Sequence, residues 1–216
     1  MNLLILGATG RTGKHLINEA IKEGHYIHAL VRDPKKLKLE SRCKFYIGSP
    51  LDQEVLRDAM HGCDAVLSTL NISRNSDFPW APLRTPISFL SDSIKNILKI
   101  AQEKNIKRVI VTTAWGVGDT KKDLPKWFNW LIDHSNIRYP YQDHENQEQL
   151  LKLSDIEWTA VRPVGLINKD KKKPVKVSFE NNPKPSLTIS RKAVALFMLE
   201  ILKENNYIRM TPTISQ

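Results

Sequence analysis

Residues 2–13 read Asn-Leu-Leu-Ile-Leu-Gly-Ala-Thr-Gly-Arg-Thr-Gly, and this stretch decides the fold of the 216-residue chain. A short apolar run typical of a buried strand ends at Gly7, and apolar residues then recur at helical spacing to residue 23. Glycines between a strand and a helix allow a tight turn, close approach of a pyrophosphate, and close packing of the helix on the sheet. The free N–H groups at the start of the helix would attract a phosphate. The stretch predicts a dinucleotide-binding turn; the alternative is a glycine-rich turn with only a structural role.

The same alternation of strand and helix continues along the chain. Two strands joined by a helical crossover must run parallel, and near-continuous apolar strands indicate a sheet covered on both faces. We therefore predict an α/β fold with a doubly wound, Rossmann-like parallel sheet in a single domain, 1–216, with substrate lids at about 71–90 and 115–142. Predicted strands span 2–6, 26–31, 44–47, 64–70, 108–112 and 157–162; predicted helices span 12–23, 54–60, 91–104, 124–138, 143–154 and 193–203, with Asp143 and Ser190 as caps.

Composition excludes several classes of protein. The 33 Lys and Arg against 23 Asp and Glu give a formal charge of +10, but the excess is spread along the chain, which argues against nucleic-acid binding. Its one dense run, 169–173, fits a solvated loop. No apolar run approaches the ~18 residues of a membrane span, and Cys43 and Cys63 lack metal-ligand spacing. We expect a reduced, cytoplasmic protein without a membrane partner or a metal, for which a monomer is plausible.

The end of the second predicted strand indicates which dinucleotide is preferred. An NAD enzyme usually places Asp or Glu there, to accept from the ribose 2′-hydroxyl. Here the strand ends in Arg32, followed by Lys35 and Lys36, and an arginine can hold a 2′-phosphate through charge-assisted hydrogen bonds. Asp33 would point away from Arg32 if the strand persists. The sequence predicts NADPH; the alternative is ordinary surface charge.

Three stretches resemble a known family: the opening 7–13, the strand end 30–34, and Ile156-Glu157-Trp158-Thr159-Ala160-Val161-Arg162-Pro163. They are similar to the atypical short-chain dehydrogenases/reductases of the NAD(P)H-binding, NmrA-like group, and most of all to its flavin reductases of the biliverdin reductase B type. The likeness runs almost end to end. It implies that NADPH is contacted by a set of residues from the first strands and turns, with Leu70 and Thr113 along the ribose and nicotinamide. That set is Gly7, Thr9, Gly10, Arg11, Thr12, Gly13, Arg32 and Lys36, with Ser49 where many relatives carry an Asp near the adenine.

The chain departs from the resemblance in its acid/base residues. Most short-chain dehydrogenases use a Ser with a Tyr-x-x-x-Lys pair, and counting back from Glu148 puts His144 at the Lys position and Pro140 at the Tyr position. Alcohol dehydrogenation and sugar epimerisation therefore lose support. Ala114 and Gly165 stand where the biliverdin reductase B type has a serine and a histidine, which weakens the case for biliverdin as substrate.

Flavin reduction fits the residues that remain. A hydride can pass from nicotinamide to flavin without a protein nucleophile, so the protein mainly has to hold two rings at reacting distance. Trp80 and Trp115 are the candidate walls of the substrate pocket, with Trp127 or Trp130 as further possibilities and core packing as the alternative for each. The function predicted is hydride transfer from NADPH to a flavin such as FMN or FAD, a quinone or a similar planar small molecule. The rival function is an NADP-binding redox sensor without catalysis.

Two residues are candidate catalytic groups. His144 has an imidazole that could donate to the acceptor or its phosphate, or it is a polar residue in the first turn of a helix capped by Asp143. Thr113 follows the fifth predicted strand, beside the expected nicotinamide. The sequence leaves Arg162 between a ligand phosphate and an internal carboxylate, favouring the latter. A further group of acids is expected to be solvated and unpaired: Asp119, Asp123, Asp133 and Glu145.

Overall fold

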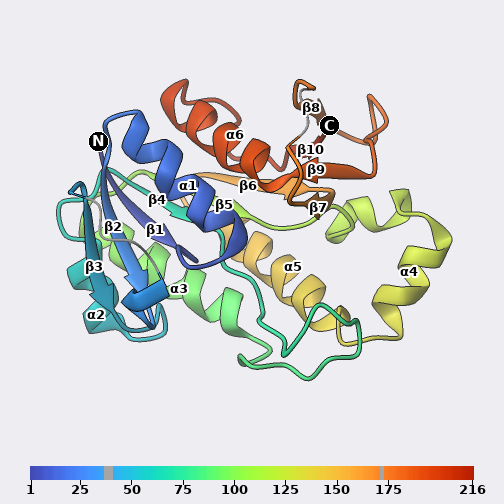
Figure 1. The fold of residues 1–216 in the computed structure, drawn as a ribbon, viewed down its shortest axis with the longest axis horizontal. Helices are drawn as coiled ribbons and strands as arrows, with labels where there is room; N and C mark the ends of the chain where they lie inside the picture. The colour runs from blue at the N-terminus through green and yellow to red at the C-terminus, as the bar shows by residue number, and fades with distance from the viewer. Residues whose placement is uncertain (37–40, 171–172) are drawn as a thin grey trace.

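The computed structural model describes residues 1–36, 41–170 and 173–216, and its centre is an eight-stranded sheet within these ranges (Figure 1). The strand order is β3-β2-β1-β4-β5-β6-β10-β8. All neighbours are parallel except the β10–β8 pair at one edge. The first six positions have the Rossmann order, which confirms the predicted fold class. The strands are β1 (Asn2–Leu6), β2 (Tyr26–Val31), β3 (Cys43–Ile47), β4 (Ala65–Ser68), β5 (Arg108–Thr112), β6 (Glu157–Pro163), β8 (Lys176–Ser178) and β10 (Thr213–Ser215).

Helices cover both faces of the sheet because successive strand side chains point to opposite sides. On one face, Leu3 and Ile5 of β1 pack with α1 (Arg11–Lys22) and α6 (Arg191–Lys203). On the other, Leu4 and Leu6 pack with α2 (Gln53–Ala59), α3 (Phe89–Glu103) and α5 (Arg138–Lys152), as Figure 1 shows above and below the sheet. The four apolar side chains of β1, from Leu3 to Leu6, are at most 1% exposed, which explains why this run is continuously apolar. Across the described residues, no helix combines the length and apolar character of a bilayer span.

The predicted boundaries are wrong after β5. Instead of helices over 124–138 and 143–154, the chain forms a 3-10 turn, η2 (Gly118–Asp123), then α4 (Lys126–Asp133), and α5 begins at Arg138. Pro140 is the third residue of α5, where the backbone N–H has no partner inside the helix, so proline is tolerated there. The two short strands β7 (Gly165–Ile167) and β9 (Thr188–Ser190) form a small separate sheet that the sequence did not predict.

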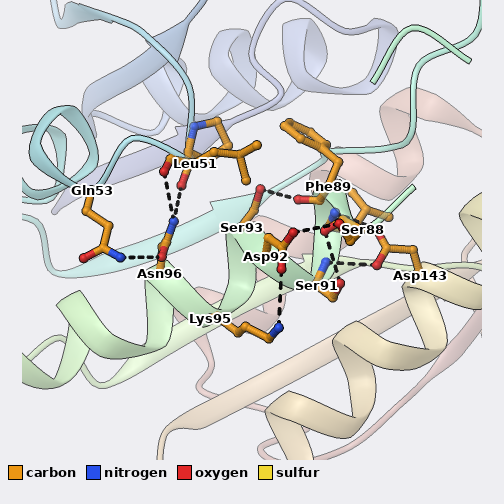
Figure 2. A network of polar contacts seen from close by, with 12 residues as sticks. Leu51, Gln53, Ser88, Phe89, Ser91, Asp92, Ser93, Lys95, Asn96 and Asp143 are labelled. Atoms are coloured by element: carbon orange, nitrogen blue, oxygen red, sulfur yellow. Dashed lines mark hydrogen bonds and ion pairs between the residues drawn. The ribbon is translucent and has the colours of Figure 1, made fainter. Parts of the chain in front are cut away.

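Asp143 was predicted to cap its own helix. It caps the neighbouring helix α3 instead. It lies within α5, 1% exposed, and its carboxylate accepts from the backbone N–H groups of Leu90 (2.6 Å) and Ser91 (3.2 Å) in the first turn of α3 (Figure 2). Ser88, which precedes α3, makes no side-chain cap to that helix. A carboxylate at a helix N-terminus both satisfies free donors and interacts favourably with the positive end of the helix dipole. Asp143 therefore joins α3 to α5.

Replacing Asp143 with alanine should lower the free energy of unfolding by about 2 kcal/mol, because two buried N–H groups would lose their acceptor. Urea denaturation measures the loss. Asp92→Ala is the matched control: Asp92 also lies in the first turn of α3 but is 43% exposed and binds Ser88 and Lys95 at the surface. We expect the control to change stability by less than about 1 kcal/mol. Equal losses in the two variants would contradict the cap.

Candidate functional site

One cavity of about 890 Å³ opens at the carboxyl ends of the parallel strands, where ligands bind in open α/β sheets. It runs from the turn after β1 to the residues after β6. The predicted site residues that line it come from four strand ends and from α5: Gly7, Thr9, Gly10, Arg11, Thr12, Arg32, Leu70, Thr113, Trp115 and His144. The fold thus brings together residues 137 positions apart in sequence, from Gly7 to His144.

The turn after β1 is built so that only glycine fits at two positions. Gly7 has φ +76°, and a Cβ there would lie 2.8 Å from the Thr69 backbone. A Cβ on Gly13 would lie 2.2 Å from the carbonyl oxygen of Gly7, so α1 could not pack this closely on β1. Gly13 does not line the cavity and acts through this packing. The first turn of α1 has neither a capping side chain nor an acidic residue, which leaves its N–H groups available to an anion.

Positive charge dominates the cavity wall. Four arginines line it, Arg11, Arg32, Arg74 and Arg191, against one carboxylate, that of Asp77. Arg11 holds Asp77 through two hydrogen bonds of 2.9 Å, and these bonds lower the pKa of the Asp77 carboxyl. Both side chains are mostly exposed, so the pair contributes little to stability. It does link the loop of residues 71–88 to the start of α1 beside the cavity.

Of the three residues predicted for the adenosine end, the structure places one at the cavity and one away from it, and it does not describe the side chain of the third. Arg32 lies directly after β2, exposed to solvent, and lines the cavity. Ser49 does not line it; its hydroxyl accepts from the backbone N–H of Leu51 at 3.3 Å. The side chain of Lys36 lies outside the described part of the chain, as do residues 171–172 of the basic run.

A buried ion pair lies behind Thr113, in the part of the cavity wall called here the cavity floor. Arg162 of β6 and Glu148 of α5 are 1% and 2% exposed, and they form a two-pronged contact of 2.9 and 2.6 Å. The Thr113 hydroxyl donates to the same carboxylate at 2.8 Å, and Arg162 also reaches Asp119 at 2.8 Å. Burial alone would lower the pKa of Arg162, but the bonds to Glu148 and Asp119 raise it.

Two of the acids expected to be unpaired have partners. Asp119 pairs with Arg162, and Asp133 pairs with Lys121 at 2.6 Å. Local pattern does not reveal either pair, because the partners lie 43 and 12 residues apart and meet only in the folded chain. The preference for an internal carboxylate at Arg162 is confirmed.

His144 is in the body of α5, not in the first turn of a capped helix as predicted. It is 3% exposed, and its Nδ1 lies 3.1 Å from Oε1 of Gln147. Burial lowers the pKa of His144 below its ordinary value, with smaller opposing effects from Gln147 and the nearby carboxylates. Because Oε1 of Gln147 can only accept, this contact requires a proton on Nδ1, and in the neutral tautomer Nε2 is then an acceptor.

The tryptophans divide between the cavity and the surface. Trp115 is buried and lines the cavity, whereas Trp80 is no wall of it: its indole N–H donates to the carbonyl of His134 at 2.8 Å and its ring packs on Phe78. Trp127 and Trp130 are more than half exposed on α4.

Sequence reasoning missed several other residues of the wall. Phe128 and Tyr141 contribute aromatic rings to it, and the Tyr141 hydroxyl donates to the carbonyl of Trp115 at 3.3 Å. Arg191 and Asn168 line the same cavity. The one signal for Arg191 was its position directly after the cap Ser190, because a cation in the first turn of a helix opposes the dipole. No group of three or more potential metal ligands occurs among the residues that the structure describes.

A family model described as NAD(P)H-binding matches residues 7–205 of the chain. The chain belongs to this NAD(P)H-binding family. The match includes the turn after β1, the residues that line the cavity and the whole of α6, and it confirms the resemblance to the atypical short-chain dehydrogenases/reductases. Relatives of the chain include proteins named as oxidoreductases and reductases.

Similar curated proteins include fungal oxidoreductases and plant isoflavone reductase homologues. An oxidoreductase of Pestalotiopsis microspora is 26% identical over 184 residues, covering 75% of this chain and 66% of its own length. An isoflavone reductase homologue of Nicotiana tabacum is 28% identical over 148 residues, covering 64% of this chain and 38% of its own length. The chain thus spans less than two thirds of these relatives.

Solved structures of the NAD(P)H-binding type share the fold at low identity. A short-chain dehydrogenase/reductase of Veillonella parvula in complex with NADP superposes with a TM-score of 0.81 at 20% identity, covering 100% of this chain and 94% of that one. An anaerobillin reductase of Escherichia coli O157:H7 superposes with a TM-score of 0.79 at 16% identity, covering 100% and 97%.

Exchanging Glu148 for glutamine should destabilise the protein by about 3 kcal/mol, because it leaves the Arg162 charge buried with one exposed carboxylate. The measurement is the free energy of unfolding in urea. Asp119→Asn removes the other partner of Arg162 and should cost less than about 1 kcal/mol, since the Asp119 side chain is 61% exposed. A Glu148→Gln loss no larger than that of Asp119→Asn would show that the buried pair does not support the cavity floor.

Proposed function

We propose that this member of the NAD(P)H-binding family is an NADPH-dependent reductase that passes a hydride to a flavin, a quinone or a similar planar acceptor. The observation that carries the proposal is the composition of the cavity of about 890 Å³ at the carboxyl ends of the strands. Its first part has the glycine turn, the uncapped start of α1 and Arg32; its second part has the rings of Trp115, Phe128 and Tyr141. A polyanionic nucleotide and a flat apolar ring fit these two parts.

The residues present fit a dinucleotide phosphate. A Cβ would fill the space at Gly7 and Gly13, and the first turn of α1 keeps its N–H donors free of any side-chain cap. The pyrophosphate would be held by the turn formed by Gly7, Thr9, Gly10, Arg11 and Thr12, and the 2′-phosphate by Arg32, with Lys36 as a second proposed contact. Leu70 and Thr113 would flank the nicotinamide, which when bound supplies the hydride. Ser49 would lie on the adenine side.

The protein's own groups orient ligands more than they move protons. The Thr113 hydroxyl donates a hydrogen bond to Glu148, so toward a ligand its oxygen could only accept. His144 stands where the lysine of most short-chain dehydrogenases would be, and its neutral ring also offers an acceptor. Pro140, at the tyrosine position, lines the cavity without a titratable group. An acceptor that takes its proton from water suits this site, and a reduced flavin is one. His144 and Thr113 are then the proposed catalytic contacts.

The rival function is an NADP-binding redox sensor without turnover. It is favoured by the same shortage of proton donors, and it predicts binding without chemistry. The two functions separate in one experiment: absorbance at the NADPH band is followed with FMN, FAD, riboflavin and a short-chain quinone, and NADP⁺ binding is measured by calorimetry. Turnover with a flavin or quinone supports the reductase. Tight NADP⁺ binding, equal affinity for NADPH and no turnover with any acceptor would support the sensor. Salt-dependent DNA binding without dinucleotide binding would contradict both.

Arg32→Ala should weaken NADPH binding about 10- to 100-fold while leaving NADH binding unchanged, because a charge-assisted bond to the 2′-phosphate contributes about 1.5 to 3 kcal/mol. Dissociation constants for both cofactors give the ratio. Lys35→Ala is the control, since Lys35 is exposed nearby and does not line the cavity. If the ratio of NADPH to NADH affinity is the same in wild type and Arg32→Ala, the assignment of Arg32 is wrong.

A further inference from the structure

Arg191 is a buried cation that has no ion-pair partner among the residues that the structure describes. It is the first residue of α6, 8% exposed, and lines the cavity. Its Nη1 donates to Oδ1 of Asn168 at 2.6 Å, a neutral partner, and no ion pair joins it to any acid in the described ranges. Charged side chains are rarely this buried unless they are paired, because removing an ion from water is costly.

The surroundings of Arg191 make the uncompensated charge more costly. Burial lowers the pKa of Arg191, the charge of Arg11 lowers it further, and Asp77 opposes them; Asp77 is itself bound by Arg11. The start of α6 adds the positive end of a helix dipole. This part of the cavity wall therefore has a net positive field that the described side chains do not balance.

The two helices that bring these charges together pack on each other. α1 and α6 lie side by side on one face of the sheet, both beginning at its carboxyl end (Figure 1). Their first turns thus meet the same cavity, and both first turns lack acidic residues. An anion between them would be attracted by the uncapped start of α1 and by Arg191; at the start of α6, the Ser190 hydroxyl already accepts from the Ala193 N–H.

We propose that Arg191 and Asn168 form a phosphate-binding element of the cavity, in addition to the glycine turn. Arg191 would offer its guanidinium to two phosphate oxygens, a geometry that a lysine cannot reproduce. Asn168 accepts from Arg191 through Oδ1, which orients the guanidinium and leaves the Nδ2 hydrogens for the same phosphate. This rests on the proposed function, and the phosphate has two possible sources: the pyrophosphate of the dinucleotide or the phosphate of an acceptor such as FMN.

The test is calorimetric binding to wild type, Arg191→Gln and the matched control Lys192→Gln. Lys192 follows Arg191 in the same helix turn and carries the same charge, but it is 39% exposed, pairs with Asp170 and does not line the cavity. The probes are NADP⁺, FMN and riboflavin; FMN and riboflavin differ by one phosphate. Binding needs no turnover, so the reductase and sensor functions give the same readout.

Arg191→Gln should weaken binding of one phosphate-bearing probe at least 10-fold while the control stays within about twofold of wild type. Loss for NADP⁺ assigns the element to the pyrophosphate; loss for FMN but not riboflavin assigns it to the acceptor. Unchanged binding of both NADP⁺ and FMN overturns the proposal, as does an equal loss in Lys192→Gln. Where wild type binds no flavin, the proposed acceptor class fails and the NADP⁺ measurement alone decides Arg191.

Arg191→Lys and Asn168→Ala keep the test sound if the glutamine variant is unstable. Thermal unfolding of each variant without ligand shows whether it folds. Arg191→Lys keeps the charge but loses the planar fork, so we expect a smaller loss than with glutamine for the same probe. Asn168→Ala removes the hydrogen bond that orients the guanidinium, and it should also weaken binding of that probe. Wild-type affinity in both of these variants would also overturn the proposal.

Discussion

The whole arrangement depends on how closely the start of α1 approaches the end of β1. A single methyl group on Gly13 would lie 2.2 Å from the Gly7 carbonyl, so α1 takes its present direction only because no side chain intervenes. α6 then packs along α1, which places the first turns of both helices and the residues Arg11 and Arg191 at the same cavity. A backbone contact thus decides where the positive charge of the site lies.

A second constraint holds the opposite wall. Arg162 comes from the central sheet and Glu148 from α5, so their buried contact fixes the helix that carries His144 and Pro140 relative to β5 and β6. Such a pair adds little net stability compared with apolar packing, because both ions lose their water. Its value here is positional, since the same carboxylate also orients the Thr113 hydroxyl.

The sequence predicted the features that follow from local pattern. The six parallel strands, the turn at Gly7 and the cap at Ser190 are each visible within a few residues, and they are where the structure has them. α5 was placed too late, because the sequence predicted Asp143 as its cap, whereas the helix begins at Arg138 and has Pro140 in its first turn. The three-residue strands β7 to β10 are too short to show a period. The partners of Asp143, Asp119 and Arg191 depend on which elements become neighbours, which no local pattern contains.

Asp143 has a consequence for local opening of the molecule. The amide hydrogens of Leu90 and Ser91 belong to α3, but their acceptor belongs to α5. They can exchange with solvent only when their bonds to Asp143 break, because the first turn of α3 frays, the two helices separate or α5 unwinds. The exchange rate of these two amides therefore reports in part on α5, through Asp143, which lies more than 50 residues further along the sequence.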